Sequence, residues 1–250
     1  MINFHESNIK RAIKNVFLKR NINLVVIEPR HGLGDSIIVS GLVNFLSSSN
    51  PNKFFYYCVP DSRNFISIRW MFQNLKNVCV ISLADGRQAR QISGFFNSTY
   101  LPLGVRGIDK NIYRLDEYYY ECAKVPIEKR WQSVLCPPGP LSSYLYKKLN
   151  PREEPYILIC ANHSNRRDVP IKVKNINSLQ LIYVTEESDN IFDWVDLIMH
   201  AREIHTVNTS FMHLVESCFA KIDTYSCVFY FHELDRPKCN ISQLPWIIVK

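Results

Sequence analysis

Short apolar runs alternate with stretches of helical periodicity along the first third of the chain. The apolar runs predict buried strands, and the periodic stretches place apolar side chains on one face of a helix. The predicted elements are a helix over His5–Lys19, a strand over Asn23–Glu28, a helix over Ser36–Phe45, a strand over Phe54–Val59, a helix over Asn64–Leu75 and a strand over Val78–Leu83. This order predicts a parallel sheet with right-handed crossovers.

The last part of the chain repeats the same alternation. Strands are predicted over Tyr156–Cys160, Leu179–Val184, Glu203–Val207 and Thr224–Val228, and helices over Ile191–His200 and Ser210–Phe219. Between the two units, a segment rich in tyrosine and proline contains predicted helices over Tyr113–Ala123 and Leu141–Leu149. Its many prolines indicate a connector. We therefore expect an α/β fold with two facing Rossmann-like lobes, residues 1–137 and 138–250, and an interdomain cleft.

The composition is that of an ordinary globular protein. Of the 250 residues, 46% are hydrophobic and 21% are charged, and no apolar stretch reaches the ~18 residues needed to cross a bilayer. The basic N-terminal segment Met1–Arg20 lacks the compact apolar core of a secretory signal, so we expect a cytoplasmic protein. The eight cysteines form no C-x-x-C pair, which favours reduced, buried thiols over disulfides or zinc ligation.

The formal net charge of +7 is modest and dispersed along the chain. Such a charge suits a phosphate-bearing ligand or an acidic acceptor. No block of lysine and arginine is dense enough to indicate nucleic acid as a partner.

A loop with two glycines follows the first predicted strand. Gly32 and Gly34 let the backbone turn sharply and leave space for a ligand at the carboxyl edge of the sheet. Asp35 has two interpretations: it caps the helix that follows, or it points into the cleft as a general base. His31 either contacts phosphate or acceptor, or packs against the turn.

A second strand-to-helix turn lies in the last part of the chain. Asn208, Thr209 and Ser210 are short polar residues at the start of a predicted helix, and His213 lies on its first turn. Backbone amides, hydroxyls and an imidazole together suit a pyrophosphate. The alternative is an ordinary capped helix with a half-buried histidine.

Two other loops follow strands of the second unit. Arg166 and Arg167 come after Tyr156–Cys160 and can hold phosphate oxygens, or form a solvated basic loop. Thr185 and Glu186 end the Leu179–Val184 strand, where they can contact a ribose or a base edge.

The segment His31–Val39 resembles the N-terminal Gly-Asp loop of the heptosyltransferase-like branch of GT-B glycosyltransferases. Val207–Leu214 resembles the Asp-Thr-Gly-Leu-Ser-His-Leu motif of that branch, with Asn208 and Ser210 in place of its Asp and Gly. Ile191–Ile198 and Glu128–Trp131 look like segments of small transferases from bacterial and large-DNA-virus genomes.

The resemblance implies that the second lobe binds a nucleotide sugar and that the first lobe faces the acceptor. It matches Asp35 to the catalytic base, and it matches Thr209, Ser210 and His213 to the diphosphate site. One of the two arginines, Arg166 or Arg167, would neutralise the leaving group. We expect an inverting glycosyltransferase that uses a UDP- or GDP-linked sugar and a glycan or glycoprotein acceptor. No other cofactor is expected, and no metal, since the chain has no Asp-x-Asp pair.

Two alternatives stay open. A methyltransferase that uses S-adenosylmethionine also begins with a strand, a Gly-x-Gly turn and a helix, but it leaves the second motif without a role. A non-catalytic module that binds a nucleotide sugar or ADP-ribose is consistent with Asn208. The oligomeric state does not follow from the sequence.

Overall fold

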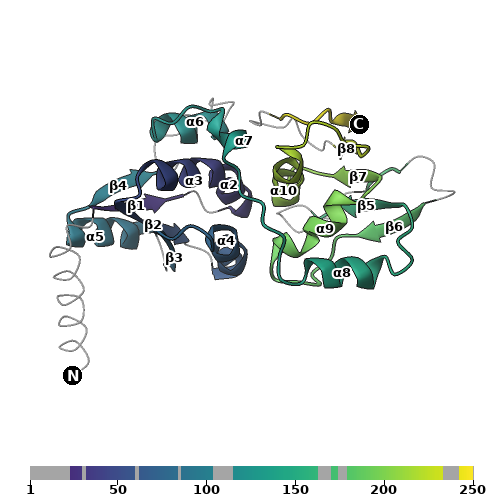
Figure 1. The fold of residues 1–250 in the computed structure, drawn as a ribbon, viewed down its shortest axis with the longest axis horizontal. Coiled ribbons are helices and arrows are strands. Elements are labelled where there is room, and N and C mark those ends of the chain that lie inside the picture. Colours follow the sequence, from purple (N-terminus) through teal and green to yellow (C-terminus); the bar gives the residue numbers. More distant parts are fainter. Residues whose placement is uncertain are drawn as a thin grey trace, which may run out of the picture.

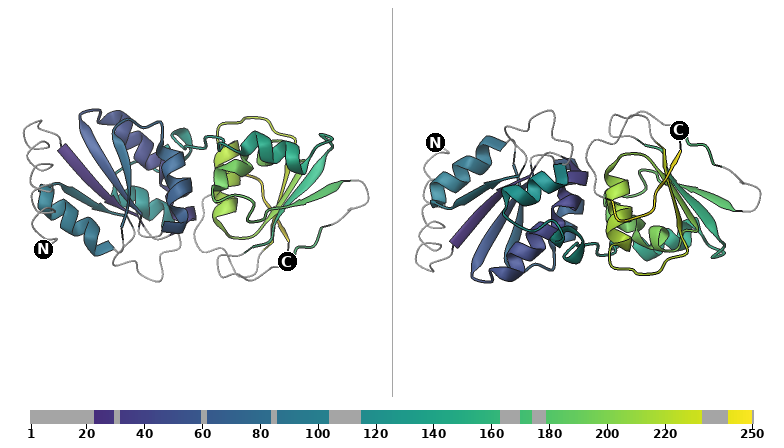
Figure 2. Two further views of the ribbon diagram at one scale, coloured as in Figure 1. Left: turned by 90° about the horizontal axis from the view of Figure 1, so that it is seen from below. Right: turned by 90° about the horizontal axis from the view of Figure 1, so that it is seen from above.

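The computed structural model folds the chain into two lobes that lie side by side along the longest axis of the molecule (Figure 1). It describes residues 23–29, 32–59, 62–83, 86–103, 115–162, 170–173, 179–232 and 242–249. Each lobe is built on one parallel sheet with helices packed against it, as both views of Figure 2 show. The expected α/β fold with two Rossmann-like lobes is confirmed.

The first sheet has the strand order β3-β2-β1-β4, and all its strands are parallel. The strands are β1 (Asn23–Glu28), β2 (Lys53–Val59), β3 (Val78–Ser82) and β4 (Thr99–Pro102). Alternate side chains of β1 enter two different cores: Val25 and Ile27 join the large core, whereas Leu24 and Val26 join a smaller cluster. Both faces of β1 are therefore buried, which explains its continuous apolar sequence.

The helices of the first lobe cover both faces of this sheet. They are α2 (Leu33–Ile38), α3 (Ser40–Ser49), the 3-10 helix η1 (Ser62–Asn64), α4 (Phe65–Phe72) and α5 (Gly86–Phe96). Ile37, Leu42 and Ile68 belong to the large core, whereas Ala89 of α5 belongs to the smaller cluster. Helix α5 therefore covers the opposite face from α2, α3 and α4.

A connector leads from the first lobe to the second. It contains α6 (Leu115–Cys122), α7 (Lys129–Gln132) and α8 (Ser142–Leu149). A Cβ atom on Gly41 of α3 would lie 2.5 Å from the carbonyl oxygen of Lys129 and 2.6 Å from that of Arg130. Only glycine allows α3 and α7 to approach this closely. Further along, the Trp70 indole donates a hydrogen bond of 3.0 Å to the Pro138 carbonyl and ties the connector to α4.

The second sheet has the strand order β6-β5-β7-β8-β9, and its strands are also parallel. The strands are β5 (Tyr156–Cys160), β6 (Gln180–Tyr183), β7 (Glu203–Thr206), β8 (Val228–His232) and β9 (Ile247–Val249). The 3-10 helix η3 (Ile191–Trp194), α9 (Val195–Met199) and α10 (Ser210–Phe219) gather with α8 on one face of this sheet (Figures 1 and 2). Leu158, Ile204, Leu197 and Leu214 are fully buried between them.

The predicted elements agree with the structure in type, with several corrections. The predicted helix over Ser36–Phe45 is two helices, because the chain turns at Val39 between α2 and α3. The strand predicted over Thr224–Val228 was wrong: β8 begins at Val228 and runs to His232. Among the described α-helices and strands, four were missed, namely α5, α7, β4 and β9. The predicted helix over His5–Lys19 lies outside the described residues.

Three further findings concern other expectations from the sequence. The seven cysteines in the described part of the chain are all free, and the sulfurs of Cys136 and Cys218 lie 3.3 Å apart. No described helix combines the length and the apolar character that a membrane span requires. The division into lobes at residues 137 and 138 stays a prediction.

Candidate functional site

The strand order of each sheet marks a place where ligands bind. In an open parallel sheet, the crevice lies at the carboxyl ends of the two neighbouring strands whose connections run in opposite directions. In the first lobe these strands are β1 and β4, and in the second they are β5 and β7. The loop after β1 leads into α2 and the loop after β7 leads into α10. Both loops singled out in the sequence therefore lie at such a crevice.

The first turns of α2 and α10 touch each other across the boundary between the lobes. A Cβ atom on Gly34 would lie 2.9 Å from Cδ2 of His213 and 3.4 Å from Cα of Ser210. A contact of 2.9 Å is closer than side chains tolerate, so glycine is required here for space. The structure thus brings Gly34, Ser210 and His213 together, with Asp35 on the same turn as Gly34. Figure 1 shows α2 and α10 next to each other.

Asp35 is not the cap of α2. The N-cap residue is Gly32, which has extended backbone angles and no side-chain cap, and Asp35 lies within the first turn. The capping interpretation of Asp35 is therefore wrong. Its Oδ1 accepts a hydrogen bond of 2.7 Å from the hydroxyl of Tyr119. Its Oδ2 lies 2.7 Å from the position that a Cβ on Gly32 would take, so glycine leaves room for the carboxylate.

The N-terminus of α10 offers hydrogen-bond donors that the described residues do not use. Its N-cap is Thr209, which has extended backbone angles and no side-chain cap, and the first turn has no acidic residue. The Thr209 hydroxyl oxygen is buried and has no hydrogen-bond partner in the described part of the chain. Free N–H groups and the helix dipole favour an anion at such a position. Asn208 is exposed and Ser210 is half-buried.

His213 is buried and neutral. The edge of its ring that carries Cδ2 faces Gly34. Its Nδ1 atom lies 4.0 Å from a carboxylate oxygen of Glu216, and this Nδ1 has no hydrogen-bond partner among the described residues. Burial, and secondarily the charge of Arg130, lowers the pKa of His213 from 6.5 to about 3. The contact with Glu216 is therefore no ion pair at neutral pH, and His213 can offer a phosphate an N–H group but no positive charge. The match of His213 to the diphosphate site stays a prediction.

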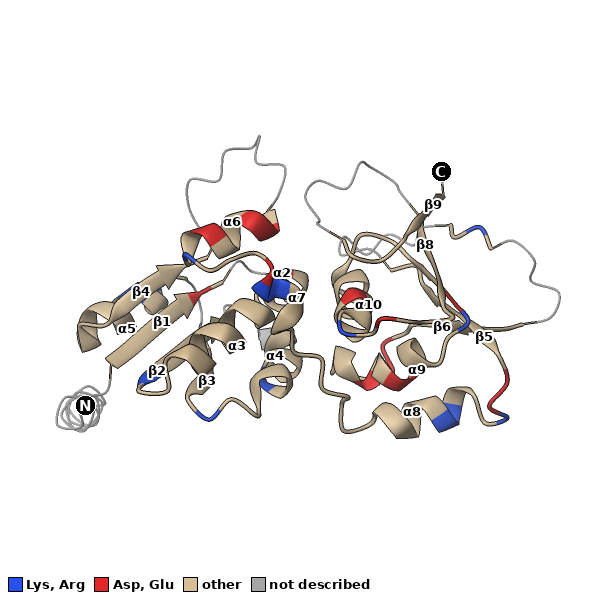
Figure 3. Ribbon diagram, turned by 45° about the horizontal axis from the view of Figure 1, so that its top comes forward, with Lys and Arg blue, Asp and Glu red and all other residues tan. Residues whose placement is uncertain are grey.

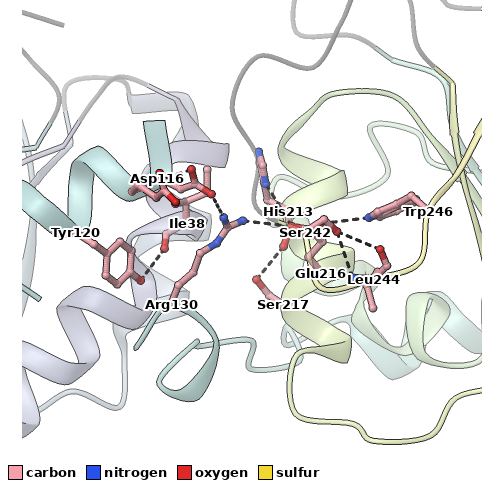
Figure 4. A network of polar contacts seen from close by, with 11 residues as sticks. Ile38, Asp116, Tyr120, Arg130, His213, Glu216, Ser217, Ser242, Leu244 and Trp246 are labelled. Atoms are coloured by element: carbon pink, nitrogen blue, oxygen red, sulfur yellow. Dashed lines mark hydrogen bonds and ion pairs between the residues drawn. The ribbon is translucent and has the colours of Figure 1, made fainter. Parts of the chain in front are cut away.

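A buried charge network joins the two lobes beside this site (Figure 4). Arg130 of α7 is only 3% exposed and forms ion pairs with Asp116 of α6 and, at 3.2 Å, with Glu216 of α10. The Trp246 indole donates a hydrogen bond of 3.2 Å to the other oxygen of Glu216. Burial raises the pKa of Glu216, and Arg130 opposes this effect. Figure 3 shows acidic residues on α6 and α10 with basic residues of α7 between them.

The sequence analysis did not assign these charged residues to the site. Glu128–Trp131 was noted only for its resemblance to other transferases, and nothing in the local pattern links Arg130 to Glu216, which is 86 residues away. Tyr119 was also missed, although its helix was predicted. It lies 84 residues from Asp35, so no spacing rule connects them.

Other predicted site residues lie apart from the contact between α2 and α10. Thr185 and Glu186 are exposed in the loop after β6, an edge strand of the second sheet. His31, Arg166 and Arg167 lie outside the described residues. Among the residues that are described, no group of three or more histidine, cysteine or acidic side chains is placed to hold a metal ion.

A groove of about 810 Å³ opens between the lobes. Its wall in the first lobe consists of α4 residues, including Phe65 and Trp70, and its opposite wall includes Leu141, Ser188 and Asp189. Neither the α2 turn with Asp35 nor the α10 turn with His213 lines this groove, so the ligand cleft expected around them stays a prediction.

By sequence, the chain matches no protein-family profile and no curated protein. By structure, it is similar to a glycosyl transferase family 9 protein from Veillonella parvula, with a TM-score of 0.58, 10% identity and coverage of 91% of this chain and 85% of the other. It is also similar to the dodecameric iron-containing heptosyltransferase TibC in complex with ADP-D-β-D-heptose. The TM-score is 0.53 at 10% identity, and the match covers 90% of this chain and 62% of the other. At this identity the similarity shows the two-lobed fold alone.

Proposed function

We propose that the chain is a glycosyltransferase that moves a sugar from a nucleoside-diphosphate sugar to a hydroxyl of a glycan or glycoprotein acceptor. The observation that carries the proposal is the contact between α2 and α10. Gly34 of α2 lies against Ser210 and His213 of α10, and Asp35 is the next residue on that turn of α2, while the N-terminus of α10 has no side-chain cap. Sugar transfer needs this pair of groups, one to accept a proton and one to bind a diphosphate.

In the proposed reaction, Asp35 removes the proton from the acceptor hydroxyl as its oxygen attacks the anomeric carbon. The bond between the anomeric carbon and the diphosphate oxygen breaks at the same time, so the configuration inverts. The departing nucleoside diphosphate takes the electron pair and stays at the N-terminus of α10. There the backbone N–H groups and the dipole stabilise its negative charge.

His213 contributes a neutral N–H group to the diphosphate in this mechanism. Because its pKa is lowered to about 3, the ring stays uncharged over the range in which such enzymes work. Positive charge is instead expected from Arg166 or Arg167. These groups supply the donors that a metal ion provides in other transferases, so we propose a metal-independent reaction. The TibC protein, by contrast, is described as containing iron.

The nucleotide of the donor stays open between ADP, UDP and GDP. The sequence favours UDP or GDP, whereas the structural relative TibC was observed with an ADP-linked heptose. Thr185 and Glu186, exposed after β6, are proposed to contact the nucleoside. The methyltransferase alternative gives the second lobe no role, and no feature of the described structure favours it.

The test combines binding with turnover. The purified protein is screened by thermal shift against ADP, UDP, GDP, their sugar conjugates and S-adenosylmethionine, and sugar transfer is then measured with the donor that binds. Asp35→Asn should abolish transfer and keep donor binding. Binding without transfer by the wild-type protein would favour a non-catalytic module. Stabilisation by S-adenosylmethionine alone would overturn the proposal.

A further inference from the structure

Helix α6 makes polar contacts with α2 and with Arg130 of α7, which in turn contacts α10. The Tyr119 hydroxyl donates to Oδ1 of Asp35 at 2.7 Å, and the Tyr120 hydroxyl donates to the carbonyl oxygen of Ile38 at 3.1 Å. Asp116, one turn earlier on α6, forms an ion pair with Arg130. A single helix thus contacts the first turn of α2, its last turn, and the arginine that reaches α10. Figure 4 shows the contacts of Tyr120 with Ile38 and of Asp116 with Arg130.

The contact between Tyr119 and Asp35 fixes the direction of the carboxylate. Tyr119 is fully buried, so its ring and hydroxyl cannot move without disturbing the core. A hydrogen bond to a carboxylate is stronger than one between neutral groups. With Oδ1 engaged, rotation of the carboxylate is restricted and Oδ2 keeps a defined direction. A general base needs such a fixed direction, because the oxygen that accepts the proton must lie in line with the hydroxyl that it deprotonates.

The ion pairs of Arg130 fix α6 relative to α10. Asp116 is fully buried, Arg130 is 3% exposed and Glu216 is 1% exposed. Arginine presents its donors in a rigid planar fork, so pairing with two carboxylates sets the angle between the helices that carry them. Glu216 follows His213 by one turn of α10. The position of the diphosphate site relative to α6 is therefore set by the same arginine.

We propose that Tyr119 is a positioning residue for Asp35, and that the ion pairs of Arg130 hold its helix in place against α10. The inference rests on the proposed role of Asp35 as the base. It assigns to α6 and α7 of the connector the alignment of the two halves of the site.

The experiment is a pair of double-mutant cycles with a matched control. Tyr119→Phe removes the hydroxyl that contacts Asp35, whereas Tyr120→Phe removes an equally buried hydroxyl on the same helix whose partner is a backbone carbonyl. Each variant is combined with Asp35→Ala. Unfolding in urea and steady-state transfer are measured for all of them, and the two cycles report the contact and its catalytic role separately.

In the unfolding cycle, the losses from Tyr119→Phe and Asp35→Ala should not add. Removing Asp35 leaves the Tyr119 hydroxyl buried without this acceptor, so deleting the hydroxyl as well relieves that cost. Tyr120→Phe and Asp35→Ala should add. Additive losses of unfolding free energy in both pairs would show that Tyr119 and Asp35 do not interact, whatever reaction the protein catalyses.

In the transfer cycle, Tyr119→Phe should lower kcat about tenfold or more and leave the KM of the donor unchanged, because a misdirected base affects chemistry and not donor binding. Transfer should be absent in every variant that carries Asp35→Ala, so the comparison with Tyr120→Phe carries this test, and Tyr120→Phe should keep the wild-type kcat. An unchanged kcat in Tyr119→Phe would overturn this inference alone. Absence of transfer by the wild-type protein would overturn the proposed function, while the unfolding cycle would still report on the contact.

Discussion

Replacing His213 should make the protein less sensitive to acid. Burial lowers the pKa of His213 to about 3 in the folded chain, against an ordinary value of 6.5. Between these two values the unfolded chain binds a proton at this position and the folded chain does not. Stability therefore falls as the pH drops below 6.5, and it keeps falling until the pH nears the pKa of the folded protein.

The size of this effect follows from the two pKa values. Each pH unit below the unfolded pKa costs about 1.4 kcal/mol, so lowering the pH from 7 to 5 should cost about 2 kcal/mol through His213 alone. The side chain is only 7% exposed, so solvent screens this effect little. His205 and His232 also have lowered pKa values, that of His232 near 4, and they add their own losses. A difference between variants is therefore needed to isolate His213.

The assay is urea unfolding followed by tryptophan fluorescence, at pH 7 and at pH 5, for the wild type and for His213→Gln. The loss of unfolding free energy between the two pH values should be smaller in the variant by about 2 kcal/mol, because glutamine cannot be protonated. The control is His200→Gln at an exposed position, which should keep the full wild-type loss. Equal losses in the wild type and in His213→Gln would refute the conclusion that His213 is held neutral.

Four shorter predictions follow. Gly34→Ala should weaken nucleotide binding in thermal-shift titrations, because its methyl group would lie 2.9 Å from Cδ2 of His213; unchanged binding would contradict the close contact. Gly41→Ala should cost about 1–3 kcal/mol in urea unfolding, because its methyl group meets two backbone carbonyls that cannot move aside. Arg130→Met should cost about 3–5 kcal/mol, since the buried carboxylates of Asp116 and Glu216 lose the guanidinium that pairs with both; a loss below about 1 kcal/mol would show that water reaches them. Treatment with EDTA should leave transfer unchanged, and activity that is lost and then restored by iron would show a metal requirement.

Most strands, including the edge strands β3 and β6, could be predicted from the sequence, whereas the edge strands β4 and β9 could not. β1 and β5 have the predicted bounds because both of their faces are buried, so the positions from Leu24 to Ile27 and from Tyr156 to Cys160 are apolar. β4 and β9 are short, and none of their residues is fully buried, so burial imposes no long apolar run on them. Helix α5 was missed because its stripe toward the sheet is narrow: Ala89, Ile92 and Phe96 pack against the smaller cluster, and the polar Ser93 interrupts them.

The break between α2 and α3 depends on a contact that no local pattern reveals. The apolar periodicity continues through Val39, so the sequence predicts one helix. The structure turns there, and α3 packs through Gly41 against the backbone of α7. A distant segment thus decides where the helix is interrupted.

The loops of the candidate site could be placed from the sequence, because they follow strands and contain glycine or capping residues. Their partners could not. Tyr119 lies on a helix that the sequence predicts, but tyrosines on such a helix are as consistent with packing as with a role in the site. The contact of Tyr119 with Asp35 joins residues that are 84 positions apart in the sequence. The ion pairs of Arg130 bring together three segments that only the fold makes neighbours. A single sequence shows which residue types are present, but it does not show which residues that are distant in the sequence contact each other in the fold.

The buried charges between the lobes fix the orientation of the lobes more than they raise the free energy of unfolding. Taking Asp116, Arg130 and Glu216 out of water costs free energy that their attraction offsets only in part, and apolar side chains of similar size often stabilise a protein more. Apolar packing, however, allows two lobes to slide or rotate by small amounts. The contact of Gly34 with His213 leaves no room for such a shift. An arginine fork between two carboxylates has one favourable geometry, so it fixes the orientation in which α2 meets α10. A site divided between two lobes requires this fixed orientation, and the connector supplies it.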